Sequence, residues 1–154
     1  ADEARFVGAR RVRNRFISNS EDIVTESFGG FSGGTVDDLD TFSVTASASS
    51  RIQRDLSSGD WNADLINRSF VFSAVLWVDS GTETLRLGIT HPADASHLSS
   101  DITVTTTPTR YSFGATFTGN GAGITAQFWN GTDAQARTCN VTSIMMPPLL
   151  VSSR

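Results

Sequence analysis

The sequence contains no lysine and few of the residues that build covalent or metal-bound sites. Its basic side chains are twelve arginines, and it has two histidines and a single cysteine, Cys139. One cysteine excludes a disulfide within the chain, so packing or assembly must stabilise the fold. Because its neighbours alternate between apolar and polar, we predict that Cys139 is a small core residue rather than a reactive thiol. Without lysine there is no phosphate-binding loop of the Gly-Lys-Ser/Thr type.

Long hydrophobic runs are also missing. No stretch approaches the roughly 20 apolar residues of a membrane helix, and no charged start followed by an apolar run indicates a signal peptide. The chain begins at Ala1 without a methionine, which fits a processed protein or a piece of a longer polypeptide. No segment keeps apolar residues at helical spacing for three turns. We therefore expect no membrane partner and little helix.

Apolar and polar residues alternate with period two along most of the chain, which predicts about nine strands. These strands cover residues 13–19, 40–48, 51–56, 69–79, 83–90, 102–106, 110–118, 123–129 and 137–145. The strand at 69–79 is apolar on both faces, as in the middle of a packed sheet, and this predicts a core position for Trp77. Asp-Ser-Gly and Asn-Gly sequences between strands suit tight turns. The sequence thus predicts an all-β fold, an antiparallel jelly-roll-like β-sandwich.

Charge divides the chain into an arm and a body. Residues 1–16 hold five arginines against Asp2 and Glu3, whereas the remainder is acidic and brings the net charge to −4. We predict an extended basic N-terminal arm over 1–16, a β-sandwich domain over 17–148 and a C-terminal tail over 149–154. An arginine-rich arm suits an acidic surface on a neighbouring subunit, and a solvated tail explains it as well. The acidic body argues against nucleic acid as a partner. The predicted partner-binding residues of the arm are Arg5, Phe6, Arg10, Arg11, Arg13 and Arg15.

The first 22 residues resemble a segment that recurs in bacteriophage virion proteins. Residues 4–14 read ARFVGARRVRN and residues 18–22 read SNSED. In those proteins a GARRVxN entry leads into an SEDF strand and then into a carbohydrate-binding-module-like β-sandwich. The segments at 53–57, 70–77 and 107–116 follow the same layout. Ile23 stands where those proteins have Phe, and the WGAQ ending of many of them is missing.

This resemblance implies a non-catalytic structural protein of the phage virion, a capsid decoration or head-fibre protein. Its partners would be the major capsid protein, other virion proteins and copies of itself, and its localisation the virion. Because the same module occurs in tail fibres, a glycan- or receptor-binding role is the alternative, and an accessory domain of a hydrolase is a third hypothesis. Head or tail location, oligomeric state and copy number stay open.

Two tryptophans are candidates for a glycan or subunit contact. Trp61 follows a Ser-Ser-Gly-Asp turn, and Trp129 ends a predicted strand beside an Asn-Gly turn. Aromatic side chains with one exposed face stack on sugar rings, and they equally fill a sandwich or meet another subunit.

No motif predicts catalysis. Residues 30–34 match the G-x-S-x-G pattern of a nucleophile elbow, but the required α/β context is missing, so a flexible glycine loop is predicted there. The four glutamates offer no evident carboxylate pair for glycoside cleavage.

Two groups of residues could bind a metal ion. His91, Asp94 and His97 share one loop, but their spacing matches no established site. Residues 37, 38 and 40 are aspartates that could coordinate calcium, as the resemblance to β-sandwich binding modules implies, or could form an acidic strand edge. The calcium candidates are Asp37, Asp38 and Asp40, and no other cofactor is expected.

Overall fold

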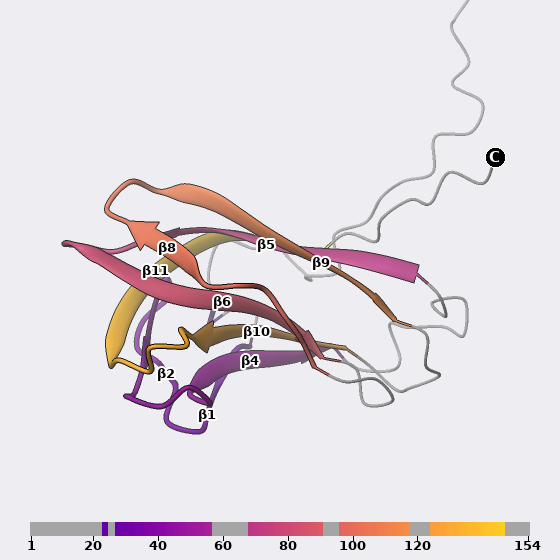
Figure 1. Ribbon diagram of the computed structural model, residues 1–154, viewed down its shortest axis with the longest axis horizontal. Helices are drawn as coiled ribbons and strands as arrows, with labels where there is room; N and C mark the ends of the chain where they lie inside the picture. Colours follow the sequence, from indigo (N-terminus) through magenta and orange to yellow (C-terminus); the bar gives the residue numbers. More distant parts are fainter. Residues whose placement is uncertain (1–22, 25–26, 57–67, 91–95, 118–123, 147–154) are drawn as a thin grey trace, which may run out of the picture.

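The computed structural model describes residues 23–24, 27–56, 68–90, 96–117 and 124–146, and these residues form strands and turns. Their eleven strands make two antiparallel sheets that pack face to face (Figure 1). Within this part of the chain, no helix has the length and apolar character needed to cross a membrane.

Each sheet is built from strands that lie far apart in the sequence. Sheet A contains, in spatial order, β1 (Gly29–Phe31), β4 (Arg51–Leu56), β10 (Ile124–Asn130), β6 (Thr82–Thr90) and β7 (His97–Leu98), with β8 (Ile102–Thr105) also paired to β6. Sheet B contains, in order, β2 (Thr35–Val36), β3 (Thr41–Val44), β11 (Arg137–Met145), β5 (Arg68–Trp77) and β9 (Thr109–Phe117).

The chain passes repeatedly from one sheet to the other. It changes sheets between β1 and β2, β3 and β4, β4 and β5, β5 and β6, β8 and β9, β9 and β10, and β10 and β11. Such crossing between two antiparallel sheets confirms the predicted all-β, jelly-roll-like sandwich. Three short strands, β1, β2 and β7, were not predicted, because strands of two or three residues are too short to show an alternation. The arm at 1–16, the predicted strand at 13–19 and the tail at 149–154 lie outside the described residues.

The core lies between the inner faces of the sheets and is rich in phenylalanine. The fully buried Phe128 of β10 lies at its centre. The ring centroid of Phe128 is 5.0 Å from that of Phe72, 5.4 Å from that of Phe42 and 5.6 Å from that of Phe28. Tilted aromatic pairs at these distances stabilise a core beyond their buried area. This cluster joins the middle of sheet A to sheet B.

The structure confirms the predicted burial of Cys139 but not that of Trp77. Cys139 is 1% exposed, and burial raises the pKa of its thiol to about 12, so the thiol stays protonated and unreactive at neutral pH. Alternation along β5 sends Phe70, Phe72, Ala74 and Leu76 into the core. Trp77 therefore lies, half-buried, on the outer face of sheet B. The prediction assumed that a strand with apolar residues on both faces is covered on both faces. In this two-layer sandwich only the inner face of β5 is covered by the other sheet.

Replacing Phe128 by alanine is expected to lower the free energy of unfolding by about 3–5 kcal/mol, because it leaves a cavity between the sheets. The matched control is Phe31→Ala, whose side chain is 46% exposed, with an expected cost of about 1 kcal/mol or less. Urea unfolding followed by circular dichroism measures both. Equal losses for the two variants would contradict the central position of Phe128.

Candidate functional site

Polar and aromatic side chains gather on the outer face of sheet A, which is the face turned away from the core. Along β10, Ala126, Phe128 and Asn130 are buried in the sandwich. Alternation therefore places Thr125, Gln127 and Trp129 on the outer face. In the sheet register Trp129 lies opposite Arg51 of β4 and Arg86 of β6.

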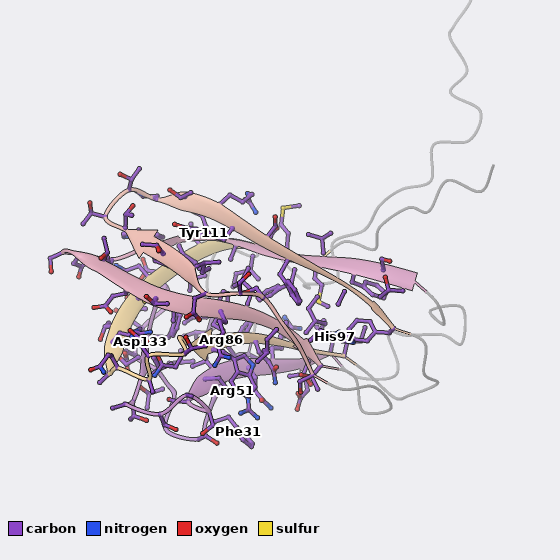
Figure 2. The ribbon with its side chains drawn as sticks, viewed as in Figure 1. Phe31, Arg51, Arg86, His97, Tyr111 and Asp133 are labelled. Carbon is purple, nitrogen blue, oxygen red and sulfur yellow. The ribbon has the colours of Figure 1, made fainter. Side chains whose placement is uncertain are left out.

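Four of these side chains form what we call the stacked row: Phe31, Arg51, Trp129 and Arg86. Cζ of Arg51 lies 3.9 Å from the ring centroid of Phe31 and 4.2 Å from that of Trp129. Its guanidinium group therefore contacts an aromatic ring from each neighbouring strand. Arg86 continues the row at 5.8 Å from the Trp129 ring. Figure 2 shows Phe31, Arg51 and Arg86 one after another across sheet A. Each such contact stabilises by about 0.5–2 kcal/mol, depending on its exposure.

Glycines bring Phe31 to its place in the row. A Cβ on Gly34 would lie 2.0 Å from the carbonyl oxygen of Arg51, and one on Gly30 would lie 1.9 Å from the carbonyl oxygen of Gly34. Only glycine permits these approaches, so β1 can pair with β4 and set Phe31 opposite Arg51. The loop predicted at 30–34 is shorter than expected: Gly30 and Phe31 belong to β1, and only residues 32–34 form a turn, in which Ser32 and Gly33 have positive φ.

Another glycine makes room for Trp129. A Cβ on Gly88 of β6 would lie 2.9 Å from both Cδ1 and Nε1 of the Trp129 indole, and 2.8 Å from Cδ2 of Leu98. The indole therefore lies against the backbone of its neighbouring strand, which fixes its position across β6.

A network of two glutamines connects the row to the next cross-strand positions. Oε1 of Gln127 accepts hydrogen bonds from Nε1 of Trp129 and Oγ1 of Thr90, both at 2.8 Å. Nε2 of Gln127 donates to Oε1 of Gln53 at 3.2 Å, and that oxygen also accepts from Nε of Arg51 at 3.0 Å. The network fixes the orientation of both Trp129 and Arg51, because each donates into it.

Backbone carbonyls in the turn at residues 45–50 accept hydrogen bonds from both arginines of the row. Nη1 of Arg51 donates to the carbonyl of Ser49 at 3.1 Å, and Nη2 of Arg86 donates to that of Ala48 at 3.0 Å. The buried Asn130 holds this turn in place, since its Nδ2 lies within 3.0 Å of the carbonyl oxygens of Thr45, Ser47 and Gln135. The row is therefore built on a fixed scaffold.

The two arginines of the row differ in their electrostatic partners. Nε of Arg86 lies 3.8 Å from Oδ1 of Asp101. Hydrogen bonds from the Thr132 hydroxyl and backbone, together with Arg86 and Arg137, hold the pKa of Asp101 below its usual value. Arg51 has no carboxylate partner among the described residues, and desolvation lowers its pKa.

The structure brings one predicted contact residue, Trp129, into this site. Trp61 and the arginine-rich arm lie outside the described residues. Sequence reasoning missed Phe31, Arg51 and the glutamines. The alternation in β4 was visible, but nothing in the sequence showed that β4 pairs with β10.

The predicted metal ligands lie away from the row. Asp37 accepts hydrogen bonds from the hydroxyls of Thr35 at 2.8 Å and Ser43 at 2.5 Å. Asp38 accepts one from the backbone of Leu39 at 2.7 Å, and Asp40 one from the hydroxyl of Thr41 at 3.1 Å. These bonds give the aspartates roles in their own turn, and calcium binding there stays a prediction. His97 packs edge-on against Phe117 at 5.2 Å, while His91 and Asp94 lie outside the described residues.

A hollow of about 580 Å³ lies at one end of the sandwich, lined in part by Asp79, Glu83 and Arg137. Arg137 is buried, with Nε 3.2 Å from Glu83 and Nη2 2.8 Å from Asp133. These two carboxylates neutralise its charge, so Arg137 serves to tie β6 and β11 to the loop that carries Asp133.

Comparison with known proteins places the fold among carbohydrate-binding modules. No protein-family model and no curated protein matches the sequence. Among solved structures, the CBM22-1 xylan-binding domain of Paenibacillus barcinonensis Xyn10C has a TM-score of 0.65 at 10% identity, covering 94% of this chain and 100% of that one. The family 11 module of Clostridium thermocellum, in complex with a β-1,3-1,4-mixed-linked tetrasaccharide, has a TM-score of 0.52 at 10% identity, covering 90% and 96%.

A third similar structure is part of an enzyme. The CBM22-1 and GH10 modules of Clostridium thermocellum endo-1,4-β-D-xylanase 10B, complexed with xylohexaose, match with a TM-score of 0.59 at 11% identity. The match covers 88% of this chain but 28% of that one. The present chain therefore has the β-sandwich fold of a carbohydrate-binding module, a fold that also occurs as a separate domain attached to enzymes.

Gly88→Ala is expected to displace the Trp129 ring and to lower the free energy of unfolding by about 1–3 kcal/mol, because the added methyl group overlaps the indole. Gly114→Ala on β9 is the matched control, since a Cβ there meets its nearest atoms at 3.6 and 3.8 Å. Tryptophan fluorescence, measured with Trp61 and Trp77 replaced by phenylalanine, reports the Trp129 ring, and urea unfolding reports the stability. An unchanged Gly88 variant would contradict the packing of Trp129 against β6.

Proposed function

We propose that this protein is a non-catalytic glycan-binding module and that it binds its ligand on the outer face of sheet A. The observation that carries the proposal is the stacked row, in which two aromatic rings and two guanidinium groups lie beside hydrogen-bonding amides on one sheet. The fold supports it, because similar modules are described as xylan-binding or in complex with an oligosaccharide.

The chemistry of this face suits a sugar. The faces of a pyranose ring carry C–H groups that pack on aromatic side chains, and its rim carries hydroxyls that exchange hydrogen bonds. Phe31 offers the most exposed ring of the row, at 46% exposure. Gln53 lies at the next outward position of β4 after Arg51, and Thr125 lies one outward position further along the sheet, opposite Asp55; both carry hydrogen-bonding groups. Since the amide network and the turn at 45–50 already fix Arg51 and Trp129, binding would require little further ordering of these two side chains.

The proposal favours the second of the hypotheses drawn from the sequence. A purely structural role in a capsid had been the first, and its support is the resemblance of residues 1–22 to virion proteins. That resemblance and a glycan-binding face are compatible, since the proteins that share the segment include tail fibres. Attachment to a virion remains a proposal, and deletion of residues 1–16 tests whether attachment to a particle depends on the basic arm.

Replacing Trp129 by alanine is expected to weaken glycan binding at least tenfold, because it removes an aromatic ring from the centre of the face. Isothermal titration with xylohexaose and with a mixed-linked β-glucan tetrasaccharide, preceded by a glycan array, measures the effect. Circular dichroism and urea unfolding establish that the variant is folded.

The matched control is Trp77→Ala, which removes a half-buried tryptophan from the outer face of sheet B. Its affinity is expected to equal that of the unaltered protein. A Trp129 variant with full affinity, or a Trp77 variant that alone loses binding, would move the site away from sheet A.

A further inference from the structure

The stacked row carries an unbalanced positive charge. Arg86 lies near Asp101, whereas Arg51 has no carboxylate partner in the described part of the chain. Nε of Arg51 donates to Gln53 and Nη1 to the carbonyl of Ser49. Both acceptors are uncharged, and Nη2 donates to none of the described residues. One cation with an unused edge therefore stands at the centre of the proposed binding face.

The surroundings of Arg51 orient this edge. The rings of Phe31 and Trp129, at 3.9 and 4.2 Å, contact the guanidinium group, and hydrogen bonds hold Nε and Nη1. A planar guanidinium fixed in this way presents its remaining N–H groups in a defined direction, which suits the oxygens of a carboxylate or sulfate. The group is also half-buried, and burial lowers its pKa. Burial disfavours the charged form of the guanidinium group, and a bound anion would stabilise that charged form.

We infer that the ligand of this face is an acidic glycan, whose carboxylate or sulfate group pairs with the free edge of Arg51. This inference rests on the proposed glycan-binding function and specifies its ligand class. The proposed binding is noncovalent.

The charges around the row limit the kind of acidic glycan. Asp55 lies on the same strand, four residues or about 13 Å from Arg51, and its Oδ1 accepts a hydrogen bond from Thr125 at 2.7 Å. Asp101 lies on the other side, close to Arg86, and the whole chain carries a net charge of −4. A continuous polyanion would meet these acids, whereas a glycan with single acidic groups places its charge at Arg51 alone.

The test uses pairs of short oligosaccharides that differ by the acidic group. The pairs are xylotetraose with and without one glucuronic acid branch, trigalacturonic acid with one free carboxylate and its fully methyl-esterified form, and a κ-carrageenan tetrasaccharide with one sulfate and its desulfated form. Titration calorimetry of the full chain is expected to show that the acidic member of at least one pair binds tenfold to a hundredfold more tightly than its neutral member. The first two pairs report a carboxylate, and the third reports a sulfate.

Arg51→Gln is expected to abolish this preference, and Arg51→Lys to keep only part of it, because lysine retains the charge but not the planar fork. The matched control is Arg110→Gln, an exposed arginine whose Nη1 donates to Ser73 and to the carbonyl of Ser143, on sheet B. It should keep the full preference. Urea unfolding verifies that each variant is folded, and the lysine variant provides the test if the glutamine variant unfolds.

Two different failures can be told apart. If neutral and acidic members of the pairs bind equally, or if the Arg51 and Arg110 variants lose the preference to the same degree, the inference is wrong and the glycan-binding function stands. If no member of any pair binds, and the neutral xylohexaose and β-glucan oligosaccharides do not bind either, the proposed function fails and the inference fails with it.

Discussion

The register of β10 between β4 and β6 is the constraint on which the rest of the structure depends. Its side chains alternate, so burial of Phe128 against Phe42 and Phe72 of sheet B sends Trp129 to the opposite face. A shift of one residue would place the indole in the core and the phenyl ring in solvent. The aromatic core thus determines which residues stand opposite Arg51 and Arg86, and the surface site follows from interior packing.

Glycines, which have no side chain, are as important for this site as the residues whose side chains form it. Gly34 lets the chain pass against the backbone of Arg51, and Gly88 leaves space for the indole of Trp129. Buried Asn130 then holds the turn whose carbonyls accept hydrogen bonds from both arginines. The aromatic and cationic groups are consequently fixed before any ligand arrives, which is the condition for binding without a large loss of conformational entropy.

The sequence predicted the fold better than the site, for a physical reason. Alternation is a local property, so the longer strands, the antiparallel sandwich and the burial of Cys139 followed from it. Partners across a sheet are not local: Arg51 and Trp129 are adjacent in the sheet, yet the sequence offers no sign of their pairing. Trp77 was wrongly predicted to be a core residue, because alternation assigns side chains to two faces of a strand but does not show which face packs against the other sheet. Trp129 was identified as a contact residue, but Phe31 was hidden within a glycine-rich segment that resembles a loop.

The central place of β10 in sheet A has a consequence for the synthesis of the chain. Its neighbours β4 and β6 are made long before residues 124–130 leave the ribosome, and neither pairs with the other. Until β10 enters, both present unpaired backbone groups on an apolar sheet, which is an exposed template for aggregation. At about 5–20 residues per second, this interval lasts several seconds. Recombinant yield should therefore depend on chaperone supply and on slow translation at low temperature more than on the stability of the finished sandwich.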